Sequence, residues 1–127
     1  MKPLLPLVAV VALAGCAAQP DPNAFGAIAD DVVSVNVQHY GAELDPVTYP
    51  FVEPNPDTLG GADLVRHWVY ETVSEACQSG QRWEVMRDES LLLRKDDIVD
   101  AALLYVCPEH RGLVPSGRVA ELERMAL

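Results

Sequence analysis

The sequence has little positive charge. Lysine occurs only at Lys2 and Lys95, and 9 basic residues face 19 acidic ones among 127 residues, which gives a formal net charge of −10. Proteins that bind nucleic acid or adhere to anionic lipid use basic residues to neutralise phosphates. This balance therefore argues against both kinds of partner. An acidic surface favours a basic or cationic partner, or it only keeps the chain in solution.

The sequence also lacks an apolar run of transmembrane length. Its longest apolar stretch is Leu4 to Leu13, which Pro6 interrupts. About 20 apolar residues are needed to cross the hydrocarbon core of a bilayer. The stretch is therefore predicted to be a targeting signal and not a membrane-spanning helix.

Motifs of catalysis and cofactor binding are missing as well. No serine lies in a G-x-S-x-G elbow, no glycine-rich phosphate loop occurs, and no cysteine lies in a C-x-x-C pair. The sequence predicts no enzyme, no cofactor and no metal site.

What is present begins at the first residue. MKPLLPLVAVVALAGC carries a positive Lys2, the apolar stretch, and then Leu13-Ala14-Gly15-Cys16, which resembles a bacterial lipobox. The resemblance implies a signal peptide over 1–15, cleavage between Gly15 and Cys16, and acyl chains such as palmitate on Cys16. The alternative is an ordinary secretory signal cleaved nearby.

Lipidation of Cys16 defines an expected location and a first partner. The mature protein would be exported and held in membrane lipid, on the outer face of the cell membrane or in an outer-membrane leaflet. Loss of Lys2 with the signal leaves 8 basic and 19 acidic residues, a formal net charge of −11.

The two remaining cysteines are Cys77 and Cys107. An even pair in an oxidising compartment predicts a disulfide, with reactive thiols or metal ligands as the alternatives. A bridge across 30 residues contributes roughly 3.5 kcal/mol on the chain-entropy model.

The predicted organisation is a flexible tether over 16–29, with small, polar and proline residues, followed by a small helical domain over 30–127 with its core at 58–110. Residues 31–40 fit either a strand, from alternating valines, or a helix. The helix is favoured because a lone strand has no partner. Four prolines between 43 and 58 predict an extended loop.

Apolar spacing predicts further helices over 58–79, from 83 onward, over 96–106 and over 116–126. Asp57 or Thr58, Asp96 or Asp97, and Ser116 are the expected N-caps, and Gly80 is the expected end of the first of these helices. The predicted fold class is mainly α, a bundle of three to five short helices stapled by one disulfide.

The two tryptophans flank the first cysteine of the pair. Trp68 and Trp83 are predicted to pack in the core near the disulfide. The alternative is that one of them lies exposed in a cleft, as an anchor for a ligand or a protein.

Cys77, Gly80 and Trp83, followed by an alanine-containing helix that ends in Tyr105-Val106-Cys107-Pro108, form a further pattern. In these residues the chain resembles the DUF732 family of small exported actinobacterial proteins. The resemblance implies a small helical domain with one disulfide, encoded by an actinobacterium or its phage, and no established activity.

Two histidine patterns are weaker candidates. His67 lies at helical spacing from Asp63 and Glu71, which is typical of a solvated helix face but also suits a cation or a catalytic base. If the cysteines were reduced, Cys107 and His110 could bind zinc.

The leading expectation is therefore a lipid-anchored extracytoplasmic module that binds a protein or another envelope partner. One alternative is a small envelope hydrolase or metal-dependent enzyme at His67. Another is a phage- or prophage-encoded surface lipoprotein that modifies the host envelope, for example by superinfection exclusion.

Overall fold

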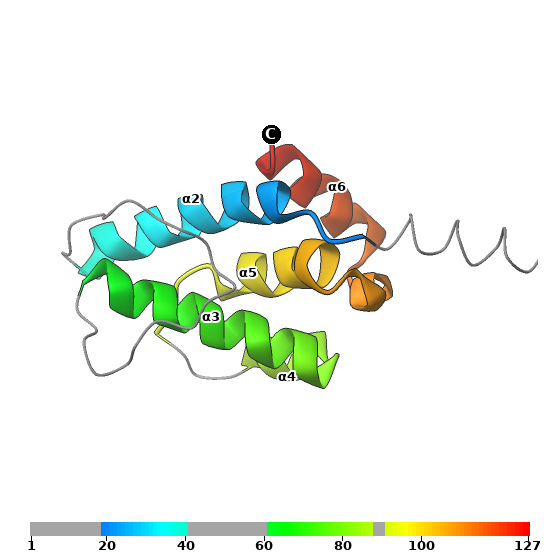
Figure 1. Cartoon of the computed structure of the whole chain (residues 1–127), viewed down its shortest axis with the longest axis horizontal. Helices are drawn as coiled ribbons and strands as arrows, with labels where there is room; N and C mark the ends of the chain where they lie inside the picture. Colours follow the sequence, from blue (N-terminus) through cyan, green and yellow to red (C-terminus); the bar gives the residue numbers. More distant parts are fainter. Residues whose placement is uncertain (1–18, 41–60, 88–90) are drawn as a thin grey trace, which may run out of the picture.

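The computed structural model describes residues 19–40, 61–87 and 91–127. All regular structure in these ranges is helical (Figure 1), so the predicted mainly α bundle is confirmed. The elements are the α-helices α2 (Pro22–Tyr40), α3 (Ala62–Ser79), α4 (Arg82–Arg87), α5 (Lys95–Ala101) and α6 (Ser116–Met125), a π-helical turn η2 (Ala102–Val106) and a 3-10 helix η3 (Pro108–Leu113).

The helices pack in layers around α5 and η2. Figure 1 shows α2 and α6 on one side of α5, and α3 and α4 on the other. Helices α2, α3 and α5 all contact one another, and α4 and α6 each contact α5. The buried core is mainly valine, isoleucine and leucine; its largest members are Phe25, Ile28, Ile98, Leu103, Leu104 and Leu122.

Helix α2 changes the predicted domain boundary. It begins at Pro22, and Phe25, Ile28 and Ala29 are fully buried. The prediction of a flexible tether up to residue 29 is wrong from residue 22 onward, because these apolar residues share one helical face and dock on the core. Helix in place of strand over 31–40 is confirmed.

The first turn of α2 is fixed to the rest of the bundle. The Asp21 side chain accepts a hydrogen bond from the backbone N–H of Ala24 at 3.1 Å, as an N-cap does. The backbone N–H of Asp21 itself donates to the carbonyl of Tyr105 at 2.8 Å. The folded body therefore starts at residue 21.

Helix α3 has the predicted apolar face and the predicted end. Val65, Val69 and Ala76 are buried, and Gly80 follows the helix with φ 60° and ψ 28°. This left-handed conformation suits glycine, which has no Cβ to clash. The predicted cap at Asp57 or Thr58 is wrong, because α3 begins at Ala62 and Gly61 is in the cap position. The proline-rich loop lies outside the described residues.

The continuous helical segment of α5 and η2, which Cys107 follows, is buried on nearly all sides. It begins at Lys95, with Arg94 in the cap position at φ 57°, so capping by Asp96 or Asp97 is wrong. Both aspartates lie in the first turn, where they face the positive end of the helix dipole. Similarly, Ser116 is the first residue of α6 and not its cap.

The predicted disulfide is present. Cys77 and Cys107 are bonded, with 5.7 Å between their Cα atoms. Cys77 lies near the end of α3, and Cys107 follows η2, whose wide turn is closed by a hydrogen bond from the Cys107 N–H to the Ala102 carbonyl at 2.9 Å. The bridge therefore joins the C-terminal ends of two neighbouring helical segments, as expected.

None of the helices in the described ranges is both long enough and apolar enough to span a membrane.

Candidate binding site

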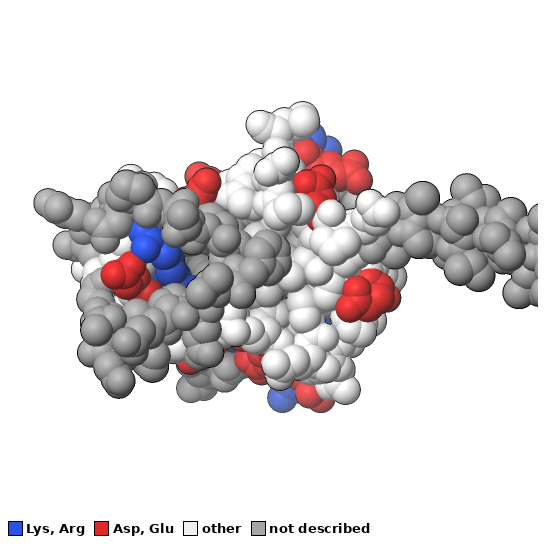
Figure 2. All heavy atoms as spheres, viewed as in Figure 1, with Lys and Arg blue, Asp and Glu red and all other residues white. Residues whose placement is uncertain are grey.

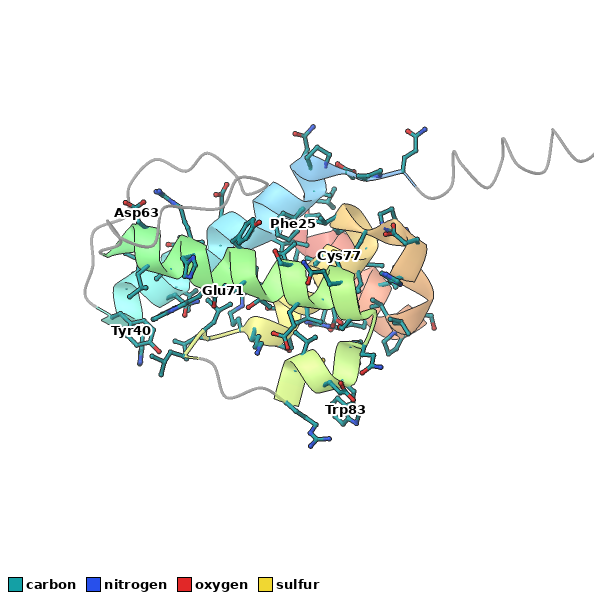
Figure 3. All side chains as sticks on the ribbon, turned by 60° about the horizontal axis from the view of Figure 1, so that its bottom comes forward. Phe25, Tyr40, Asp63, Glu71, Cys77 and Trp83 are labelled. Atoms are coloured by element: carbon teal, nitrogen blue, oxygen red, sulfur yellow. A yellow bond between two sulfur atoms is a disulfide. The ribbon has the colours of Figure 1, made fainter. Side chains whose placement is uncertain are left out.

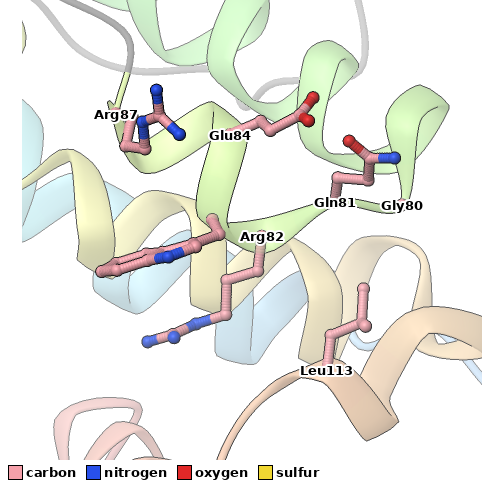
Figure 4. Close-up of a pocket in the computed structure, with 7 residues that line it drawn as sticks. Gly80, Gln81, Arg82, Glu84, Arg87 and Leu113 are labelled. Atoms are coloured by element: carbon pink, nitrogen blue, oxygen red, sulfur yellow. The ribbon is translucent and has the colours of Figure 1, made fainter.

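The candidate site is a pocket between α4 and the end of η3 (Figure 4). Its volume is about 490 Å³, and its lining consists of Gly80, Gln81, Arg82, Trp83, Glu84, Arg87 and Leu113. Trp83 is 69 % exposed and Leu113 is 42 % exposed. Pockets of this size accept small ligands or a few protein side chains.

The exposure of Trp83 overturns its predicted place in the core. Helix α4 has only six residues, and Val85 occupies its inward position and is buried. Residues two apart on a helix point in different directions, so Trp83 cannot share the face of Val85. The alternative of an exposed tryptophan is the one that the structure shows (Figure 3).

Trp68 packs against the core as predicted, but not near the disulfide, because it lies nine residues before Cys77 on α3, about 13 Å along the helix axis. It is partly buried and packs against the core. Its ring also meets the ring of Tyr40 edge-on, with centroids 5.4 Å apart, which is a favourable aromatic geometry. The two tryptophans that flank Cys77 therefore have opposite environments.

The disulfide connects the segments that lead to Trp83 and Leu113, the two apolar walls of the pocket. Cys77 lies three residues before Gly80, where the chain turns into α4 and Trp83. Cys107 directly precedes η3, which ends at Leu113. The bridge thus holds together the two chain segments that lead to Trp83 and to Leu113.

A close contact tightens the same junction. A Cβ built at Gly80 would lie 3.0 Å from Cε1 of the His110 ring. The turn into α4 therefore packs directly on η3, and a Cβ at Gly80 would require the His110 ring to shift. The His110 ring is therefore packed against the turn at Gly80. Because Cys107 is bonded to Cys77, the alternative of a zinc site at Cys107 and His110 is wrong.

An ion pair joins α4 to α5. Arg82 donates from Nε to Asp100 Oδ1 at 2.5 Å and from Nη2 to Oδ2 at 3.0 Å. Asp100 is fully buried in α5. The hydrogen bond to Asp100 raises the pKa of the Arg82 guanidinium above its ordinary value, in spite of partial desolvation. Such a bidentate pair fixes geometry as well as charge, so it attaches the first turn of α4, which carries Trp83, to α5.

The same carboxylate begins a network that reaches α6. Asp100 also accepts from Arg118 Nε at 2.8 Å, and Arg118 Nη2 donates to Asp97. Arg94 Nε donates to Asp97 at 2.7 Å, and its Nη1 pairs with Asp31 of α2 at 2.7 Å. Four helices are thus linked by ion pairs, which are buried or half-buried between α4, α5 and α6 and exposed at Asp31 of α2.

Sequence reasoning missed this network. It used Asp96 and Asp97 only as expected N-caps and did not use Asp100. The available signal was an acidic residue inside the apolar run Ile98-Val99-Asp100-Ala101. A carboxylate at such a position needs a cationic partner, because burying an unpaired charge is costly.

The His67 stripe does not form a cation site. His67 Nε2 lies 2.7 Å from Glu71 Oε1, while Asp63 pairs with Arg66 at 2.6 Å. Within the ranges that the structure covers, no group of three histidine, cysteine or acidic residues is placed to hold a metal. Figure 3 shows Asp63 and Glu71 along α3.

The acidic side chains do not form one continuous patch on the face seen in Figure 2. They lie there in small separate groups, some of them next to basic residues. Charge alone therefore marks no binding surface on this face, in contrast to the exposed apolar pair at the pocket.

The predicted lipidation and cleavage residues, Gly15 and Cys16, lie outside the described residues. The signal peptide, the acyl anchor and the location that they imply stay predictions.

No protein-family model, curated protein or solved structure matches the chain. The resemblance to the DUF732 family therefore also stays a prediction.

Proposed function

We propose that this protein is a lipid-anchored extracytoplasmic binding module of the cell envelope, and that the pocket between Trp83 and Leu113 is its contact surface. The observation that carries the proposal is the exposed indole of Trp83 on a helix that Arg82 and Val85 attach to the core.

An exposed tryptophan on a fixed support is typical of a contact residue. Burying a large aromatic side chain at an interface contributes strongly to binding, and tryptophan is enriched among the residues that dominate affinity. Because α4 is already ordered by Arg82 and Val85, little conformational entropy is lost when a partner docks.

The remaining lining suits recognition. Gln81, Glu84 and Arg87 add an amide, a carboxylate and a guanidinium to the lining. A few polar groups around an apolar contact give orientation and selectivity. The seven lining residues include no serine, cysteine or histidine that could act as a nucleophile.

The cell-envelope location is supported by the lipobox and by the disulfide. Structural disulfides persist mainly in oxidising compartments outside the cytoplasm. Intact mass of membrane-extracted protein tests this part: acyl mass on a chain that begins at Cys16 supports it, and an unlipidated chain contradicts it.

The binding surface is tested by comparing two exposed apolar residues. Trp83→Ala and Leu91→Ala each remove an exposed apolar side chain, and Leu91 is 64 % exposed and does not line the pocket. Quantitative affinity capture from envelope fractions should recover partners that Leu91→Ala keeps and Trp83→Ala loses. Equal recovery by both variants would contradict the proposal.

The phage-encoded alternative uses the same anchor and the same surface, and only its partner would differ. It stays a prediction.

A further inference from the structure

The folded body lies close to the predicted anchor. Asp21 is bonded to the body through Tyr105 and caps α2, so five residues of chain separate Cys16 from a fixed point. A fully extended chain of that length spans about 18 Å at most. The predicted tether of 14 residues would have allowed more than twice this distance.

The short tether limits how far the pocket can move from the bilayer. A body of about 100 residues has a radius of gyration of about 13 Å, which corresponds to roughly 35 Å across. The pocket therefore stays within about 50 Å of the membrane surface in every orientation of the body. Partners held in the same membrane gain a high effective concentration from this restriction.

The charge of the body argues against the lipid itself as the occupant. A mature chain with 19 acidic and 8 basic residues is repelled by anionic headgroups. The acyl chains would hold the protein near the membrane, while electrostatic repulsion between the acidic body and the anionic headgroups keeps the body from adsorbing to the lipid surface.

The pocket walls favour a protein side chain. Trp83 and Leu113, the two most exposed apolar residues of the lining, present apolar surface from two different helical segments. An apolar side chain that docks on Trp83 and Leu113 would cover exposed surface of both residues.

We infer that the pocket receives an apolar side chain from a membrane-proximal, extracytoplasmic segment of an integral membrane protein in the same membrane. This inference rests on the proposed function, since it names the partner of the same site.

Site-specific photo-crosslinking on intact cells tests it with the full lipidated chain. A photoreactive benzoyl-phenylalanine replaces Trp83 in one variant and Ala120 in a control. Ala120 is an exposed residue of α6, which Figure 1 places on the side of the bundle opposite α4. A second pair of variants carries a 30-residue glycine-serine insertion between Gln19 and Pro20.

The expected result is an adduct with an integral membrane protein at position 83 and not at position 120. The insertion raises the average reach of the tether from about 12 Å to roughly 33 Å. The pocket then occupies a thicker layer above the membrane, so the adduct yield should fall about two- to threefold.

Two results would overturn the inference, and they are distinguishable. A position-83 adduct with a soluble protein, a glycan, lipid or a second copy of the chain, or one whose yield is unchanged by the insertion, removes the membrane partner but leaves the binding surface. Equal adducts at positions 83 and 120 remove both.

Discussion

Arg82 and Trp83 are neighbours in α4 and have exchanged the environments that their chemistry would suggest. The guanidinium of Arg82 turns inward to the fully buried Asp100, while the indole of Trp83 is 69 % exposed. Side-chain polarity alone therefore does not decide which residue is buried. The inward charge stabilises the fold, and the outward aromatic residue is left for a partner.

The largest effect is expected at the buried end of this comparison. Asp100→Ala leaves Arg82 and Arg118 without their shared carboxylate, so the free energy of unfolding should fall by about 3–5 kcal/mol. Urea denaturation followed by circular dichroism measures it. Arg111→Ala is the control, because its 3.8 Å pair with Glu123 is exposed and should change stability by less than about 1 kcal/mol. Equal losses in the two variants would contradict a special role for the network.

The disulfide should come next. The double variant Cys77→Ala, Cys107→Ala should lose roughly 3.5 kcal/mol of stability, because the loop between them regains its freedom in the unfolded state. Thermal unfolding of the oxidised and reduced wild type gives an independent value. A reduced protein as stable as the oxidised one would show that packing alone positions η3 against the turn into α4.

A smaller effect is expected at the junction between the two walls. Gly80→Ala places a Cβ at a left-handed φ of 60° and 3.0 Å from the His110 ring, which should cost about 1–2 kcal/mol. The variant Gly80→Ala, His110→Ala should recover the part that is due to the contact. If the double variant is no more stable than the single one, backbone strain explains the whole loss.

The smallest change in stability is expected at the exposed end. Trp83→Ala should alter the free energy of unfolding by less than about 0.5 kcal/mol, because the indole contacts little of the core. Its affinity for the partner should fall at least about tenfold if Trp83 is a dominant contact. A large loss of stability would instead make Trp83 a structural residue.

The enzymatic alternative has its own test. If His67 and Glu71 support catalysis, His67→Ala should abolish hydrolysis in a screen of envelope substrates while the melting temperature stays within a few degrees. Activity that survives this substitution would remove His67 from consideration.

Much of the fold was predictable because it follows from local patterns. The helical spacing in α3, the glycine after it, the apolar side of α6 and the cysteine pair each depend on residues close in sequence or on the compartment. The error over residues 22–29 arose because prolines and small residues outweighed the spacing of Phe25, Ile28 and Ala29, which becomes informative only when a core exists for it to cover.

The sequence by itself determined the helical class, the disulfide and, to within a few residues, the ends of α3, α5 and α6, since periodicity, glycine conformation and cysteine chemistry are local properties. The tertiary structure alone decided that Asp100 would lie between Arg82 and Arg118, and that Trp83 would face outward beside Leu113. These outcomes depend on which helices pack together and on which side chain of a short helix packs into the core. Both are decided by contacts between residues far apart in the chain, so no local pattern predicts them.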